Sequence, residues 1–189
     1  SNLIRQTIQN AGIKPEQILG ISSTSQREGV VFIDINGNEI YAGPNLDMRA
    51  PSNLLDFQGN FAEKIHSRTG HWPFPMFLPY RLLWFKEHKP HLYEKINSVL
   101  LLNNWILYKL CREKVTDPSN GVETVLIDLE KRDWDKELIK EIGFDLSIFP
   151  PVLESGTIIG KVTKSAAAQC GLVEGIPIVL GGADTQCAM

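Results

Sequence analysis

Short apolar runs of strand length alternate along this chain with segments that have helical periodicity, and this alternation restricts the fold more than any other feature. The apolar runs lie at residues 18–22, 30–34, 99–102, 157–162 and 177–180. Runs of this length, bounded by polar residues or glycine, are typical of buried strands. Helical patterns lie at residues 4–11, 52–88, 105–110, 134–142 and 164–170. Because strands and helices alternate, the pattern predicts the α/β class.

Turn and cap residues mark where several of these elements end. The Asn-Gly pair at residues 36–37 predicts a hairpin turn, because both residue types tolerate positive φ. Thr163 is placed to cap the helix at residues 164–170, and Gly171 is placed to end it. The polar stretch at residues 116–121 is predicted to be a loop.

A long helical stretch interrupts the regular order of strands. About 60 residues separate the hairpin from the strand at residues 99–102, which is more than a simple crossover needs. This stretch is helical, with a break rich in proline and aromatic residues at 71–79. We therefore expect residues 52–98 to form a lid or an inserted helical subdomain.

The composition is that of a soluble globular domain. Apolar residues make up 43% and charged residues 22% of the 189 residues. A net charge of −3 gives no general attraction to nucleic acid or to an anionic membrane. No apolar run approaches the roughly 20 residues that cross a bilayer. We therefore expect no nucleic-acid partner and no membrane partner, and we expect a cytoplasmic protein.

Neither the cysteines nor the histidines have the spacing of a metal site. Cys111, Cys170 and Cys187 lie far apart, and no two histidines are four residues apart on one predicted helix. The cysteines are therefore expected to be reduced thiols, and no metal bound by protein side chains is expected.

A polar elbow with the sequence Ser-Thr-Ser-Gln-Arg-Glu-Gly joins the first two predicted strands at residues 23–29. In a regular strand Arg27 and Glu28 would point to opposite faces, but on an elbow their side chains can converge. A guanidinium donates hydrogen bonds and a carboxylate accepts them, so the pair suits a polyol ligand. The alternative is an exposed pair of opposite charges on a turn.

A second charged pair follows in the next segment. Asp47 and Arg49 are two residues apart and share a face if the backbone is extended. In that position they can brace the elbow that carries Arg27 and Glu28. The alternative is an ordinary surface ion pair, which contributes little to stability.

The last apolar strand runs directly into paired glycines and a predicted helix start. Gly181 and Gly182 let the backbone approach a ligand closely, and free amides at a helix start attract phosphate. Asp184 lies at this junction, where a carboxylate can accept a proton from a substrate hydroxyl. The alternative role for Asp184 is that of an ordinary N-cap.

In their order along the chain, these motifs resemble the N-terminal domain of the FGGY carbohydrate kinases. The stretches that carry the resemblance are residues 20–29, 47–50, 116–120, 126–134 and 181–186. Residues 27–31, 81–84 and 117–120 are also similar to those of one branch of the family, the autoinducer-2 kinases. The resemblance covers almost the whole chain.

The resemblance implies an actin-like, ribonuclease-H-type ATPase fold, with residues 1–189 as the sugar-binding domain and ATP with Mg²⁺ as cofactors. It implies that Asp184 is the catalytic base. It implies that four residues lie near the phosphates: Gly181, Gly182, Thr185 and Gln186. It implies that five residues lie around the substrate: Gln26, Arg27, Glu28, Asp47 and Met76.

Three positions depart from related kinases and bear on the substrate. Glycerol kinases share the triplet at residues 26–28 but have a tyrosine where this chain has Met76. The lysine of the family pattern is Arg81 here, and the Asp-Tyr pair of many pentulose kinases is Asn104-Trp105. The expected substrate is a small sugar or open-chain polyol, with the autoinducer-2 precursor preferred. The alternatives are a pentulose or polyol kinase of the xylulose, ribulose or glycerol type, and a non-catalytic sugar- or protein-binding module.

The family pattern also implies segments outside this sequence. An Asp-x-Gly-Thr phosphate loop is expected before the first residue, and a second domain after the last. On this interpretation the isolated chain is an inactive fragment whose sheet lacks its first strands. An exposed sheet edge favours association, so a homodimer is expected, and a monodisperse monomer in light scattering would contradict it.

Overall fold

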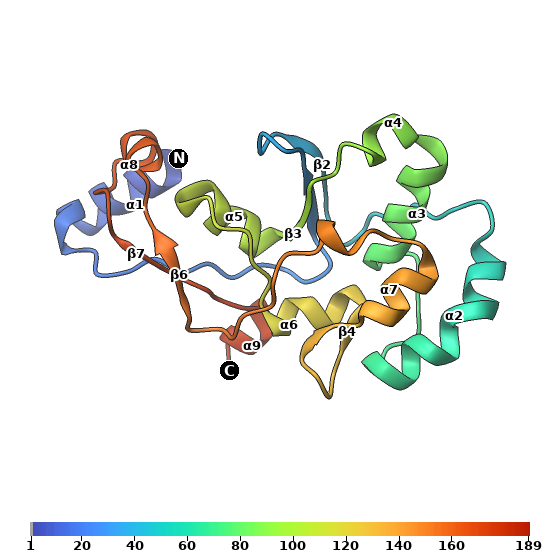
Figure 1. The fold of residues 1–189 in the computed structure, drawn as a ribbon. Helices are drawn as coiled ribbons and strands as arrows, with labels where there is room; N and C mark the ends of the chain where they lie inside the picture. Colours follow the sequence, from blue (N-terminus) through green and yellow to red (C-terminus); the bar gives the residue numbers. More distant parts are fainter. Residues whose placement is uncertain (1) are drawn as a thin grey trace.

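The computed structural model describes residues 2–189 and shows the expected mixture of helices and strands (Figure 1). The strands are β1 (Val30–Ile33), β2 (Glu39–Gly43), β3 (Ser98–Leu101), β4 (Ile127–Asp128), β5 (Asp133–Trp134), β6 (Ile158–Lys161) and β7 (Pro177–Val179). The helices are α1 (Asn2–Ala11), α2 (Leu54–Thr69), α3 (Leu78–His88), α4 (Pro90–Tyr93), α5 (Leu102–Cys111), α6 (Pro118–Gly121), α7 (Lys136–Ile142), α8 (Lys164–Cys170) and α9 (Asp184–Cys187). Short 3₁₀ turns are η1 (Pro15–Gln17), η2 (Val122–Thr124) and η3 (Leu146–Ile148).

An antiparallel sheet with the strand order β2-β1-β3 lies at the centre of the molecule. The predicted hairpin is confirmed: the Asp34 carboxylate accepts hydrogen bonds from the amides of Asn36 and Asn38 at 2.9 and 2.8 Å. Only Gly37 has a positive φ in this turn, at 82°. β2 forms one edge of the sheet. Association through a sheet edge left exposed by missing first strands stays a prediction.

Alternation along β1 and β3 separates two faces of the sheet. Val30 and Phe32 on β1 pack into the largest core, which α2, α3 and α7 also enter. Val31 and Ile33 point the other way and contact a small cluster that includes Tyr108 of α5. The opposite side of α5 belongs to another core, built with α8 and β7. Helix α5 therefore connects the two groups of helices on either side of the sheet in Figure 1.

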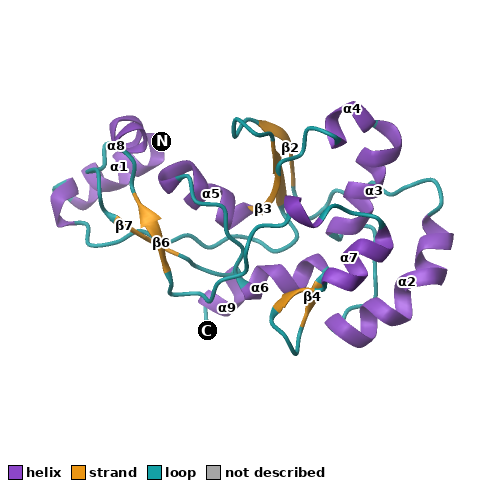
Figure 2. Cartoon of the chain, in the orientation of Figure 1, coloured by secondary structure: helices purple, strands orange, loops and turns teal. Residues whose placement is uncertain are grey.

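The strand predicted at residues 18–22 is wrong, because only one of these residues pairs with a strand. Only Ile21 makes a bridge, parallel to Ile178 of β7, with its amide bonded to the Pro177 carbonyl at 2.9 Å. Leu19 is 88% exposed and lies outside any strand. The apolar run is thus an extended connection beside the β6–β7 pair rather than a full strand (Figure 2).

The helical stretch after the hairpin has the predicted break. α2 ends at Thr69 and is capped by Gly70, whose φ of 73° is left-handed. α3 begins at Leu78, after the proline- and aromatic-rich segment. The two helices contribute buried side chains to the largest core. A lid function for residues 52–98 stays a prediction.

The predicted polar loop at residues 116–121 is wrong. Thr116 and Asp117 have no exposed surface, and residues 118–121 form the short helix α6. Ser119 and Asn120 donate hydrogen bonds to the Asp117 carboxylate, which allows this charge to be buried.

Two general properties of the described residues bear on function. Within residues 2–189, none of the helices combines the length and apolar character that spanning a membrane requires. Cys111 and Cys170 are buried thiols, and Cys187 is an exposed thiol.

We expect Thr163→Ala to lower the free energy of unfolding by about 1 kcal/mol. The Thr163 hydroxyl caps α8 by accepting a hydrogen bond from the Ala166 amide at 3.2 Å, as predicted. Urea unfolding measures the change. Ser165→Ala in the same helix is the matched control, because Ser165 is exposed. Equal stability of the two variants would show that the cap contributes nothing.

Candidate substrate site

A buried carboxylate organises the region where the predicted site residues meet. Asp117 has no exposed surface. Its Oδ1 accepts hydrogen bonds from the Ser119 hydroxyl at 2.6 Å and the Asn120 amide at 2.9 Å. Its Oδ2 accepts from the Nδ2 atoms of Asn103 at 2.9 Å and Asn104 at 3.2 Å. Asp117 is therefore satisfied by dipoles, with no cation among these four donors.

This network holds two loops that are far apart in the sequence. Ser119 Oγ accepts a hydrogen bond from the Ala183 amide at 2.9 Å, which fixes the loop after β7. The carbonyl of Asn103 accepts from the Ser23 hydroxyl at 2.7 Å, which fixes the elbow. Asp117 thus connects both loops through its immediate neighbours.

The elbow and the loop after β7 also bond directly to each other. The Thr24 hydroxyl donates to the Gly182 carbonyl at 2.9 Å, and the Asp184 amide donates to the Ser25 carbonyl at 3.0 Å. Ser25 and Ala183 form a parallel bridge. The fold therefore brings Asp184 beside the segment that carries Arg27 and Glu28.

The paired glycines are explained by this close approach. A Cβ on Gly181 would lie 1.9 Å from the Ser23 carbonyl oxygen, and one on Gly182 would lie 2.6 Å from Ser119 Oγ. Both positions are closed to any side chain because the protein's own backbone and hydroxyls fill the space. Close approach of a ligand, which the sequence analysis gave as the reason for the two glycines, is therefore not needed to explain them. Their position near a phosphate stays a prediction.

Arg27 pairs with a residue that the sequence motifs did not indicate. Its Nη1 donates to Glu123 Oε1 at 2.7 Å, and the Glu123 side chain is only 6% exposed. The other carboxylate oxygen of Glu123 lies 3.6 Å from His71 Nε2. Glu28 follows with a positive φ of 59°, a conformation that turns the chain sharply at the elbow. The alternative of a simple exposed Arg27–Glu28 pair is therefore wrong.

The charges of this cluster act on one another. The pKa of Arg27 is raised, chiefly by the charge of Glu123, with smaller contributions from Glu28 and Asp184. Burial raises the pKa of Glu28, and the charge of Glu123 raises it further against the opposing effect of Arg27. The negative charges of Glu123, Glu28 and Asp184 thus all favour the charged form of Arg27.

Arg81 fixes the elbow to the segment before α3. This guanidinium is fully buried and donates to the carbonyls of Glu28 at 2.7 Å and Met76 at 2.5 Å. Burial lowers its pKa, and the charges of Asp47 and Glu28 oppose that effect. Met76 thus reaches the site through its backbone, while its half-buried side chain packs on the largest core.

Asp47 reaches the elbow indirectly. It accepts hydrogen bonds from Tyr41 Oη at 2.5 Å and from Arg49 Nε at 2.9 Å. The Arg49 guanidinium lies 4.5 Å from the centre of the Trp84 ring. This pair is partly buried and held on both sides, so the alternative of an ordinary surface ion pair is wrong. The charge of Asp47 acts on Arg81, and Arg81 bonds to the Glu28 carbonyl of the elbow.

The remaining predicted residues lie around these two loops. The N-cap of α9 is Ala183, so the alternative that Asp184 is an N-cap is wrong. Asp184, Thr185 and Gln186 are exposed, and the Thr185 hydroxyl donates to Gln186 Oε1 at 2.6 Å. Gln26 lies beside Gly29 in the elbow.

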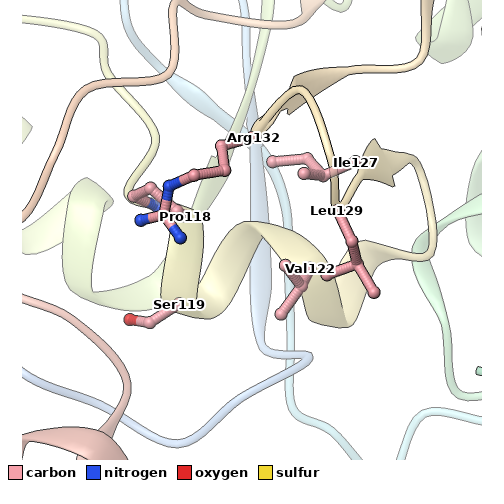
Figure 3. A pocket seen from close by; sticks show the side chains of 6 residues that line it. All are labelled: Pro118, Ser119, Val122, Ile127, Leu129 and Arg132. Carbon is pink, nitrogen blue, oxygen red and sulfur yellow. The ribbon is translucent and has the colours of Figure 1, made fainter. Parts of the chain in front are cut away.

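A pocket of about 230 Å³ lies next to the network but outside the predicted site (Figure 3). Its walls are Pro118, Ser119, Val122, Ile127, Leu129 and Arg132. Arg132 binds Glu154 through two hydrogen bonds of 2.9 and 2.8 Å. None of the predicted substrate-binding residues lines this pocket. Across residues 2–189, no group of three or more His, Cys, Asp or Glu side chains is arranged to hold a metal ion.

Comparison with known proteins agrees with the fold and with the order of the motifs. The model of the N-terminal domain of the FGGY family of carbohydrate kinases matches residues 1–189. The fold is that of the actin-like sugar kinases: a xylulose kinase from Lactobacillus acidophilus superposes with a TM-score of 0.86 at 23% identity, over 97% of this chain and 37% of that one. The chain belongs to the FGGY family of carbohydrate kinases.

Curated relatives within the family are autoinducer-2 kinases. The protein of that name from Escherichia coli strain SMS-3-5 is 39% identical over 97% of this chain. The one from Salmonella typhimurium is 36% identical over the same share. The chain spans 35% of the length of each relative.

We expect Asp117→Asn to lower the free energy of unfolding by about 3 kcal/mol. The change removes the charge and turns an NH₂ group toward donors that Asp117 now accepts from. Urea unfolding measures the loss. Asp56→Asn is the control, since Asp56 is exposed in the first turn of α2, and a change below about 0.5 kcal/mol is expected there. Similar values for the two variants would contradict the organising role of Asp117.

Glu28 is expected to titrate above the ordinary value of 4.5 for a glutamate. A raised pKa means that the folded state binds the proton more tightly than the unfolded state. Its stabilising contribution is therefore complete below pH 4.5 and is lost as the pH rises through the folded-state pKa. Carboxyl NMR titration measures the shift.

We expect Glu123→Gln to lower the pKa of Glu28, because it removes a neighbouring negative charge and frees Arg27. Glu39→Gln should leave the Glu28 titration unchanged, since Glu39 pairs with Lys109 instead. A Glu28 pKa that does not respond to Glu123→Gln would contradict the electrostatic coupling.

Proposed function

We propose that the protein containing this chain transfers the γ-phosphoryl group of ATP to a hydroxyl of a small sugar or open-chain polyol. The observation that supports this most is the junction of the elbow with the loop after β7. There the Asp184 amide bonds to the Ser25 carbonyl, and the charge of Asp184 acts on Arg27. A carboxylate for proton removal and a donor–acceptor pair for hydroxyl groups thus lie together.

In this mechanism each residue of the junction has a distinct role. Arg27 donates hydrogen bonds to the substrate oxygens and Glu28 accepts them, so the pair orients a polyol. Asp184 accepts the proton of the attacking hydroxyl, and its exposed position keeps it accessible to substrate. Arg81 holds the elbow through the Glu28 carbonyl, and the charge of Asp47 acts on Arg81.

Family membership implies ATP, used with Mg²⁺. ATP supplies the transferable phosphoryl group when it is bound. The described residues fit the acceptor side of the reaction, because they supply exposed Asp184, Thr185 and Gln186 near the glycine pair.

The preferred substrate we propose is 4,5-dihydroxy-2,3-pentanedione, the open-chain precursor of autoinducer-2. The support is the 36–39% identity to curated autoinducer-2 kinases over nearly the whole chain. A pentulose or simple polyol is the second candidate, favoured by the structural likeness to xylulose kinase.

The test is ATP-dependent phosphorylation by the complete protein encoded by the reading frame that contains this chain. The panel is 4,5-dihydroxy-2,3-pentanedione, xylulose, ribulose, erythritol and glycerol. Preference for the dione supports the proposal in full, and preference for another member replaces the substrate but keeps the mechanism. No turnover by a folded protein would favour a non-catalytic binding module.

Asp184→Asn in the complete protein is expected to lower kcat by about 10²–10⁴-fold with little change in KM. The amide keeps the size of the side chain but cannot accept the proton. Asp145→Asn is the control, because Asp145 caps η3 outside this site. Activity retained within about tenfold would rule out general-base catalysis by Asp184.

A further inference from the structure

Glu123 is a buried carboxylate that faces the predicted sugar-binding residues. It lies in the 3₁₀ turn η2 after α6 and exposes only 5% of its surface. One oxygen binds Arg27 Nη1 at 2.7 Å, and the other lies 3.6 Å from His71 Nε2. Its buried position between two side chains fixes the carboxylate toward the elbow.

The cluster contains more acidic than accessible basic groups. Glu28, Glu123 and Asp184 all act on the charge of Arg27. The second guanidinium in the region, Arg81, is fully buried, and two of its nitrogens are used by the carbonyls of Glu28 and Met76. A ligand at the elbow therefore meets three carboxyl groups and one guanidinium that already carries a partner.

We propose that Glu123 is a specificity-determining residue that restricts this site to uncharged, hydroxyl-rich substrates and excludes sugar acids. The proposal rests on the kinase function proposed above. An unpaired arginine would bind the carboxylate of a sugar acid through two parallel hydrogen bonds. Glu123 occupies that arginine and adds a negative charge, so a substrate carboxylate would meet repulsion from the remaining carboxyl groups.

Uncharged hydroxyl groups are not repelled by the carboxyl groups of this cluster. Each hydroxyl can donate to a carboxylate and accept from the free nitrogens of Arg27. Glu123 also leaves Arg27 oriented before substrate arrives, so less side-chain entropy is lost on binding. Both effects favour neutral ketoses and polyols over aldonates of the same length.

The test compares gluconate with xylulose as acceptors for the complete protein. We expect Glu123→Gln to raise the ratio of kcat/KM for gluconate to that for xylulose by about tenfold or more. Glu123→Asp keeps the charge and should keep the wild-type ratio. Glu39→Gln removes a carboxylate that pairs with Lys109 and is the matched control.

A measurement on the wild-type protein keeps the proposal testable if Glu123→Gln does not fold. Calorimetric titration with gluconate and with xylulose at rising ionic strength distinguishes electrostatic repulsion of the ligand from a poor steric fit. Repulsion between like charges is screened by salt. Gluconate binding should therefore strengthen as salt rises, whereas xylulose binding should not change.

Each outcome decides between the two proposals. An unchanged ratio in folded Glu123→Gln, or wild-type gluconate binding that weakens with salt, overturns the role of Glu123 while leaving the kinase function intact. A wild-type protein that phosphorylates gluconate better than every neutral acceptor also overturns it. A protein that phosphorylates no acceptor at all removes both the kinase function and this inference.

Discussion

A single buried carboxylate, Asp117, carries the arrangement on which the site depends. Five polar groups from four residues donate to it, so it can be buried without a cation. Asn103 also holds the elbow, through its backbone carbonyl, and the Ser119 Oγ that donates to Asp117 also accepts a hydrogen bond from the loop after β7. Because each loop alone has little apolar surface to bury, polar contacts to a rigid centre decide where it lies.

Close backbone contact between the two loops determines which residues make up the site. A Cβ at residue 181 would lie 1.9 Å from the Ser23 carbonyl oxygen, so only glycine permits this approach. With the loops in contact, the Asp184 amide bonds to Ser25 of the segment that carries Arg27 and Glu28, and Glu123 of η2 pairs with Arg27. The result is an acidic cluster around one guanidinium, which suits hydroxyl groups better than anions.

The helical stretch after the hairpin contributes to the site through a buried cation. Arg81 of α3 has no exposed surface and donates to two backbone carbonyls rather than to a carboxylate. Burying a charge in this way is costly unless its hydrogen bonds are made. Those bonds fix the elbow relative to the core beneath α3. Arg49 and Asp47, held by Tyr41 and Trp84, complete this support from the side of β2.

The sequence by itself determined the α/β class, the hairpin, and the helix caps at Thr163 and Gly171. These follow from local periodicity and turn chemistry, which depend on neighbouring residues only. The segments that carry Arg27, Glu28 and Asp184 were indicated by the order of motifs that this chain shares with its family. The tertiary structure alone decided that residues 116–121 are buried, that residues 18–22 make one bridge, and that Glu123 pairs with Arg27. Glu123 is 96 positions from Arg27, and a glutamate after a polar stretch looks like any exposed carboxylate. Pairing over such a separation depends on how the elements pack, which no local pattern encodes.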